Sequence, residues 1–237
     1  MKTTASLSKT TFILVMIISL ITVITAGAFA GKQDRQVSDF TGLDISSAIK
    51  VVLTQGNTEK LILEGDDDML ERVITEVRGN TLFIKLKDGT YNKTSQEVTA
   101  HLTFKNLSRI DLSGAVTLTG TNSMKFNDLN LDCSGATKID MNMTANKLDA
   151  DFSGASTLKL EGTVQTLDMD ISGASKIEAS SLIAKNCYLD CSGASTVTIH
   201  VTDKLRAEGS GASKISYKGN PAVVETDMSG ASKVNKI

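Results

Sequence analysis

Apolar and polar residues alternate along most of the chain from residue 106 onward, and one tripeptide interrupts the alternation at regular intervals. This tripeptide, Ser-Gly-Ala, occurs seven times, first at Ser113–Ala115, and successive copies lie 18 to 21 residues apart. Alternation with a period of two is typical of a β-strand with one buried face. A fixed repeat of this length indicates a solenoid, in which each coil buries its apolar face against its neighbours.

The apolar residues keep fixed distances from the tripeptide. Inward positions are expected one, three and five places before each Ser and five places after it, as with Leu131, Cys133 and Ile139 around Ser134. Each coil therefore has a strand on either side of Ser-Gly-Ala. The tripeptide is the corner between them, because small residues allow a tight turn and close stacking. The corner glycines are Gly114, Gly135, Gly154, Gly173, Gly193, Gly211 and Gly230.

The first part of the chain is less regular. Residues 40–54 form a degenerate first coil, in which Ser47 takes the place of the corner glycine. Asp66 is expected to cap about one helical turn, and Gly79-Asn80 is expected to turn a hairpin. A polar loop is predicted over residues 88–95, and Gln165, Asn186 and Pro221 are expected in loops between strands. Further strands are predicted at 60–64, 73–78, 81–87 and 96–104.

These patterns predict an all-β fold, namely a parallel β-helix-like solenoid with coils of about 19 residues. We expect a single domain over residues 31–237, irregular over 31–105 and regular over 106–237. The irregular part contains the hairpin and the short helix.

Residues 1–30 differ from the rest of the chain. Lys2 and Lys9 lie before a largely apolar run over residues 11–26. Ala28-Phe29-Ala30, after the run, is a small-x-small cleavage pattern. We therefore expect a signal peptide cleaved before Gly31, with an uncleaved anchor as the alternative. No Cys follows the run, so a lipoprotein is not expected. The net charge of -2 and the absence of a Lys/Arg-rich stretch argue against nucleic acid as a partner.

The three cysteines are expected to be buried free thiols. Cys133 and Cys191 share one inward position three coils apart, roughly 14 Å at ~4.8 Å per coil, which is too far for a disulfide. Cys187 and Cys191 lie four residues apart on one strand, which is also about 13 Å. His101 and His200 are poorly placed to complete a zinc site with them.

An acidic residue stands two places before every corner Ser and is expected to point outward. Stacked coils would align these carboxylates roughly 5 Å apart, a spacing at which they repel, raise one another's pKa or bind cations. The corner Ser hydroxyls and Lys138, Lys176, Lys214 and Lys233 are available to compensate. We interpret the row as structural, with a weak calcium-binding ladder as the alternative, and expect no other metal or cofactor. The row comprises Asp111, Asp132, Asp151, Asp170, Asp190, Glu208 and Asp227.

An enzymatic function is not expected. Glycoside hydrolysis needs two carboxylates in unlike environments, whereas these acids repeat in near-identical surroundings. No coil is marked by a His, an Arg or an aromatic sugar platform, and the chain contains no Trp. No nucleophile elbow, phosphate loop or zinc motif occurs either. A carbohydrate-active β-helix enzyme is the least favoured alternative.

The chain ends at Ile237, shortly after the last Ser-Gly-Ala. We expect the terminal coil to present unpaired backbone and an apolar edge, which natural proteins normally cover. The sequence therefore predicts that this end meets a partner, either a second copy or a different chain. The alternative is that Lys233 and Lys236 deter pairing.

Two segments and the repeats resemble a known family. The segment from Phe40 to Ser46 (FTGLDIS), the segment from Val51 to Gly56 (VVLTQG) and the repeated Leu-x-x-Ser-Gly-Ala-Ser resemble the family called putative auto-transporter adhesin, head GIN domain. The resemblance covers about residues 40–237. It implies a right-handed β-helix-like fold in an exported bacterial protein, of a kind frequent in Bacteroidetes, with an adhesive role and no catalytic residues.

The sequence and this resemblance together predict an exported, non-enzymatic binding or adhesion module that uses its solenoid faces to bind a protein or glycan ligand. The alternative is a self-assembling structural protein of the cell envelope. Either function places the mature chain in the periplasm, on the outer-membrane surface or outside the cell.

Overall fold

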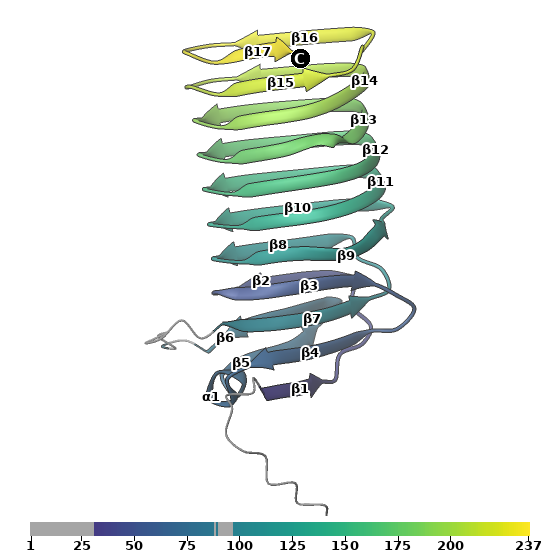
Figure 1. Ribbon diagram of the computed structural model, residues 1–237, viewed down its shortest axis with the longest axis vertical. Coiled ribbons are helices and arrows are strands. Elements are labelled where there is room, and N and C mark those ends of the chain that lie inside the picture. The colour runs from purple at the N-terminus through teal and green to yellow at the C-terminus, as the bar shows by residue number, and fades with distance from the viewer. Residues whose placement is uncertain (1–30, 88, 90–96) are drawn as a thin grey trace, which may run out of the picture.

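The computed structural model describes residues 31–87, 89 and 97–237, and these residues form one tall β-solenoid (Figure 1). About 7 turns of ~19 residues stack along a single axis, which confirms the predicted fold class. The predicted signal peptide and most of the predicted loop at 88–95 lie outside the described residues. Within the described ranges, no helix has the length and hydrophobicity of a membrane span.

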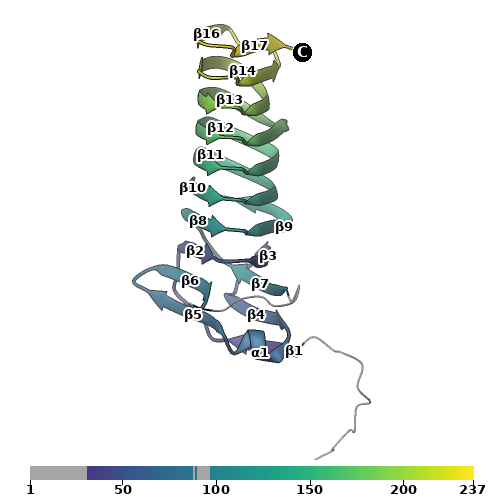
Figure 2. The same ribbon diagram turned by 90° about the vertical axis from the view of Figure 1, so that its left-hand side faces the viewer.

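Two facing sheets form the walls of the solenoid (Figure 2). One sheet, here called the acidic sheet, contains the strand segments that lead into each Ser-Gly-Ala corner, and the other, the opposite sheet, contains the segments that leave it. Neighbouring regular coils pair in parallel and in register, so that Leu129 faces Leu148 and Ser134 faces Ser153. The regular strands are β8 (Arg109–Gly114), β9 (Thr117–Lys125), β10 (Asp128–Gly135), β11 (Lys138–Gly154), β12 (Thr157–Gly173), β13 (Lys176–Gly193), β14 (Thr196–Gly209), β15 (Lys214–Lys218), β16 (Val223–Met228) and β17 (Lys233–Lys236).

The second corner of each regular coil is a bend within one long strand rather than a loop. Gln165 lies inside β12 and Asn186 inside β13, so the prediction that they occupy loops is wrong. Backbone pairing with the adjacent coils continues on both sides of the bend, and this satisfies the amides that a loop would leave to solvent. Pro221 does lie between strands, after β15 and before β16.

The N-terminal part closes one end of the solenoid. The side chain of Asp66 accepts a hydrogen bond from the Asp68 N–H and caps α1, as predicted. Met69 and Leu70 of α1 are buried, and α1 contacts β4 and β1. The predicted hairpin turns at Gly79 and Asn80. The elements here are β1 (Gly31–Arg35), β2 (Gly42–Ser46), β3 (Ile49–Gln55), β4 (Lys60–Gly65), α1 (Asp67–Leu70), β5 (Val73–Arg78), β6 (Thr81–Leu86) and β7 (Val98–Phe104).

The first coils do not stack in chain order. The coil made by β2 and β3 lies between the coil of β6 and β7 and the coil of β8 and β9 (Figure 1). Leu43 of β2 therefore faces Leu82 on one side and Ile110 on the other. The coil of β2 and β3 comes first in the chain but second in the stack. The coil of β6 and β7, which follows it in the chain, lies outside it, and the regular coils begin on its other side with β8 and β9.

The core is a narrow column of aliphatic side chains between the two sheets. The inward positions predicted from the repeat are buried through the central coils, as with Leu131, Ile139 and Leu148. The three cysteines belong to this column and are free thiols, as predicted. Burial raises the pKa of Cys133 and of Cys191 to about 12. These thiols are therefore protonated at neutral pH and pack as small apolar groups.

The corner requires a backbone conformation that glycine supplies. Gly173 has φ 111°, and a Cβ atom there would lie 2.3 Å from the carbonyl oxygen of Gly154 in the preceding coil. Ser47 occupies the same place in the coil of β2 and β3 and also has a positive φ, 81°. The Oγ atom of Ser47 accepts a hydrogen bond from the Leu86 N–H, at the end of β6 in the neighbouring coil.

A row of buried hydroxyl groups follows the corners, and the sequence analysis did not identify it. Each belongs to the residue after Ser-Gly-Ala and is at most 3% exposed. The hydroxyl of Thr137 donates to Ser156 at 2.8 Å, and the Oγ of Ser175 accepts from the Ser156 N–H at 3.3 Å. These bonds join successive coils and satisfy the hydroxyls. The row comprises Thr137, Ser156, Ser175, Ser195 and Ser213.

Candidate binding face

The predicted acids form a continuous outward row along the acidic sheet. Each stands opposite its equivalent in the neighbouring coils, as Asp151 faces Asp132 and Asp170, because the strands pair in parallel without a shift at this position. Asp44 of β2 extends the row by one coil, since it stands opposite Asp111. Asp44 was not predicted as a member of the row, although the match of residues 44–48 to the later corners indicates its position. The acid row is Asp44, Asp111, Asp132, Asp151, Asp170, Asp190, Glu208 and Asp227.

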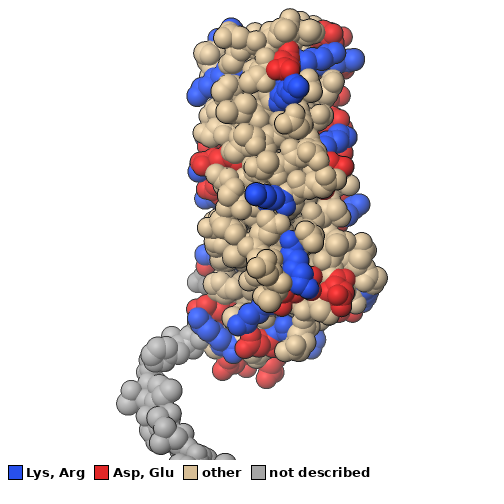
Figure 3. Space-filling view, turned by 90° about the vertical axis from the view of Figure 1, so that its right-hand side faces the viewer, with Lys and Arg blue, Asp and Glu red and all other residues tan. Residues whose placement is uncertain are grey.

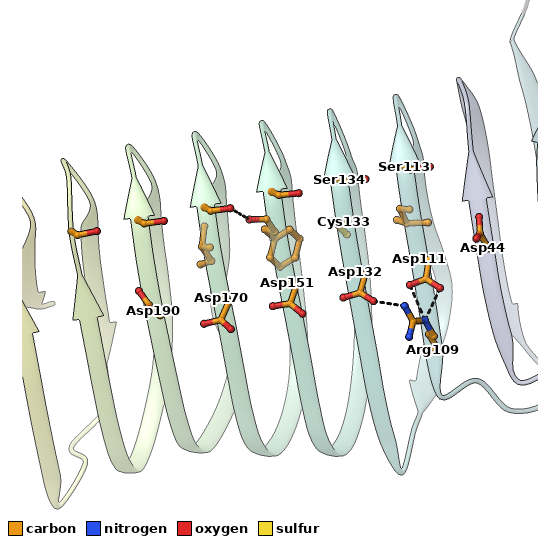
Figure 4. Close-up of a pocket in the computed structure, with 17 residues that line it drawn as sticks. Asp44, Arg109, Asp111, Ser113, Asp132, Cys133, Ser134, Asp151, Asp170 and Asp190 are labelled. Atoms are coloured by element: carbon orange, nitrogen blue, oxygen red, sulfur yellow. Dashed lines mark hydrogen bonds and ion pairs between the residues drawn. The ribbon is translucent and has the colours of Figure 1, made fainter.

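The acid row lines a shallow groove of about 700 Å³ next to the corners (Figure 4). The corner serines line its other side, including Ser134, Ser153 and Ser172. A second hollow of about 390 Å³ adjoins the row and adds Asn130, Asp149 and Asp168 from the next outward position. The acidic sheet therefore presents carboxylate, hydroxyl and amide groups in parallel lines over several coils.

Arg109 marks one end of the acid row. Its guanidinium donates to both carboxylate oxygens of Asp111, at 2.7 and 2.9 Å, and to Asp132 at 2.8 Å (Figure 4). The expectation that no Arg distinguishes any coil is therefore wrong. Arg109 lies two residues before Asp111 and points to the same face of β8, a spacing that could have revealed the contact.

Burial and neighbouring charges raise the pKa values of several carboxyl groups in the acid row. Burial, together with hydrogen bonding to Asp111, raises the pKa of Asp132 to about 6, although Arg109 opposes the rise. The pKa of Asp170 is raised by burial and then by the charges of Asp151 and Asp190. Burial and Asp111 raise the pKa of Asp44. Burial, with like-charge repulsion added to it, thus makes these carboxyl groups hold protons more tightly than isolated ones.

The compensation expected from corner serines and lysines takes another form. The Ser172 hydroxyl donates to the Phe152 carbonyl oxygen of the preceding coil and not to a carboxylate. Lys138 and Lys176 begin strands of the opposite sheet, across the corner from the acid row, and Lys176 pairs with Glu178 there. On the acidic sheet, Lys147 instead lies 2.6 Å from Asp149, beside the row.

No group of three or more His, Cys, Asp or Glu residues within the described ranges has an arrangement that could hold a metal ion. The weak calcium ladder proposed from the sequence stays a prediction. The opposite sheet carries balanced charges instead of one sign, because Lys159 contacts both Asp140 at 3.5 Å and Glu161 at 2.9 Å. The narrow edge that carries the second corners is mostly uncharged, with isolated basic side chains along it (Figure 3).

The family model described as putative auto-transporter adhesin, head GIN domain matches residues 39–221. The chain belongs to this family. The match begins beside the coil of β2 and β3 and extends to Pro221, so it contains almost the whole acid row. Membership suggests an adhesion-like role at an exported or surface location. No curated protein matches the chain.

Three solved structures share the fold of this head GIN domain protein. A putative adhesin from Bacteroides fragilis is 23% identical, with a TM-score of 0.81 over 89% of this chain and 98% of that one. A putative adhesin from Parabacteroides merdae is 20% identical, with a TM-score of 0.62 over 90% and 98%. A putative lipid binding protein from Parabacteroides distasonis is 18% identical, with a TM-score of 0.61 over 89% and 97%.

The raised pKa of Asp132 predicts a pH-dependent stability of this head GIN domain protein. The native state binds a proton at Asp132 more tightly than the unfolded state does. Stability is therefore lost as pH rises from about 4 to about 6. We expect Asp132→Asn to stabilise the protein near pH 7 by up to about 1 kcal/mol after solvent screening, and to have no effect near pH 4.

Urea denaturation of the wild type and of Asp132→Asn at both pH values measures this effect. Asp128→Asn is the matched control, because Asp128 is an exposed carboxylate on the same strand, β10. An equal change in the free energy of unfolding of Asp132→Asn at both pH values would contradict a raised pKa at Asp132.

Proposed function

We propose that this protein is an exported, non-enzymatic adhesion module that binds its ligand along the acid row and the adjoining serines. The supporting observation is the groove of about 700 Å³, which runs over several coils with the same groups repeated in each. A repeated array favours an extended ligand with its own repeat, such as a glycan chain or a protein surface, because each added coil contributes one more weak contact.

The acidic charge of the groove limits the charge and the polar groups that its ligand can carry. Six of the eight members of the acid row line the groove, and Arg109 is the basic residue that joins them. Carboxylates and serine hydroxyls hydrogen-bond sugar hydroxyls and attract cationic groups. The ligand is therefore neutral and hydroxyl-rich or carries positive charge, and its binding weakens as ionic strength rises if charge dominates.

A carbohydrate-active enzyme is the competing proposal, and Arg109 is the observation that favours it. Arg109 and Asp111 place Asp132 in surroundings that differ from those of the other acids, and unlike carboxylates are what glycoside hydrolysis needs. The groove nevertheless lacks aromatic platforms for a sugar apart from Phe152, whose side chain is buried in the core. We therefore favour binding over catalysis.

Binding of the purified protein to a glycan array and to a panel of basic and neutral proteins tests this proposal. The double variant Asp151→Asn/Asp170→Asn changes the centre of the acid row, and we expect about tenfold weaker binding to any ligand found. The control, Asp140→Asn/Glu178→Gln, changes two acids of the opposite sheet and should leave binding unchanged.

Equal binding by wild type and acid-row variant would contradict the proposal. Release of reducing ends from a glycan, abolished by Asp132→Asn alone, would replace it by the enzymatic one.

A further inference from the structure

The end of the solenoid formed by β16 and β17 is open within the described chain. Val224 occupies the inward position that Leu205 fills one coil earlier, yet Val224 is 45% exposed and Leu205 is 0% exposed. Ile237 is 62% exposed beside it. The opposite end is different, because Met69 and Leu70 of α1 are buried there and α1 contacts β4 and β1. The end formed by β16 and β17 thus presents core positions to solvent.

The open end also presents backbone amides. The N–H groups of Ser229 and Ile237 donate to Gly209 and Tyr217 in the preceding coil, at 2.8 and 2.9 Å. Because amides alternate in direction along a strand, those of Thr226 in β16 and Lys236 in β17 point to the open side. An edge of this kind is a template for pairing with another strand.

The two open strands carry opposite charges. In the acidic sheet, Asp227 of β16 stands beside Glu208, and in the opposite sheet, Lys233 of β17 stands beside Lys214. Neither Asp227 nor Lys233 has an ion-pair partner among the described residues. Asp227 and Lys233 therefore each stand beside a like charge of the coil below, whereas Glu225 of β16 pairs with Lys204 of β14.

We propose that two copies of this chain join end to end, with β16 of each copy pairing antiparallel to β17 of the other. A two-fold axis parallel to the strands places each acidic edge on a basic edge and forms two identical strand pairs at once. The alternative two-fold axis pairs β16 with β16 and β17 with β17, which brings like charges together. Charge thus selects the first arrangement. Because the contact is isologous, each copy uses its open end once and the assembly closes at the dimer.

Sedimentation velocity of the purified protein across concentration, at low and at high salt, tests the proposal. We expect a reversible dimer that weakens with salt. Asp227→Lys and Lys233→Asp should each weaken it at least about tenfold, because each places like charges opposite one another. The double variant Asp227→Lys/Lys233→Asp restores opposite charges and should recover the dimer.

Two further variants separate the pairing from general effects of charge. Asp128→Lys makes the same change in the body of the acidic sheet and should leave the dimer intact. Thr226→Pro removes an amide directed to the open edge while keeping the bonds to β14, and should abolish the dimer. A monomer at all concentrations would overturn the proposal. So would a dimer indifferent to Asp227→Lys, or one that the double variant fails to restore.

Discussion

Gly173→Ala is expected to lower the free energy of unfolding by about 2–5 kcal/mol, the sum of backbone strain and overpacking. Gly173 has φ 111°, a conformation that a residue with a side chain adopts only with strain. The new Cβ would also lie 2.3 Å from the Gly154 carbonyl oxygen, a backbone atom that cannot move without shifting its coil. Urea denaturation followed by circular dichroism measures the loss.

Gly79→Ala separates the two causes. Gly79 has φ 60° in the hairpin of β5 and β6, but nothing lies within 4 Å of a Cβ atom placed there. This variant is subject to strain alone and should cost about 1–2 kcal/mol. Equal losses in the two variants would show that close stacking of the corners contributes nothing.

The position of Gly173 also predicts how the damage spreads. Solenoid coils contact only their neighbours, so a weakened interface in the middle of the column uncouples the two halves. We expect hydrogen exchange in Gly173→Ala to accelerate more in β14 to β17 than in β2 to β7, because the capped N-terminal end retains its own core. Uniform acceleration across the chain would contradict this.

Phe152→Ala is expected to destabilise the protein by about 3–5 kcal/mol. The Phe152 side chain is 1% exposed and stands in register between the smaller side chain of Cys133 and that of Ile171. Its removal leaves a cavity that neighbouring coils cannot close, because their backbones are fixed at the strand spacing by hydrogen bonds.

Phe152→Leu is the matched control and should cost less than about 1.5 kcal/mol, since most of the volume is kept. Both values come from urea denaturation under the same conditions. A loss below about 1 kcal/mol for Phe152→Ala would mean that the column repacks around the gap, in contrast to a core fixed at native density.

The structure of the regular coils could be predicted from the sequence because each coil repeats the same short-range pattern of apolar and polar residues. Period-two alternation sets which side of a strand is inward, and the spacing from Ser-Gly-Ala sets the register between coils. The positions of Leu131, Ile139 and the acid row therefore follow from the sequence pattern alone. The cap at Asp66 and the turn at Gly79-Asn80 were also predictable, because short-range hydrogen bonds and turn conformations determine them.

Other features depend on contacts between residues far apart in the chain. Arg109 reaches Asp132 only because β8 and β10 are neighbours, and Ser47 receives the Leu86 N–H only because β2 and β6 are neighbours. The raised pKa of Asp132 follows from burial and from Asp111, neither of which alternation reveals. The second corner also differs from its prediction, because pairing on both sides allows β12 to bend without a loop.

The sequence by itself determined the solenoid, its inward positions, its corners and the row of acids, since all of these repeat locally. Only the tertiary structure decided that the coil of β2 and β3 lies between two coils that follow it in the chain. A degenerate repeat predicts that a coil forms but not which coils it pairs with, because parallel strands with similar apolar residues can pair with it on either side.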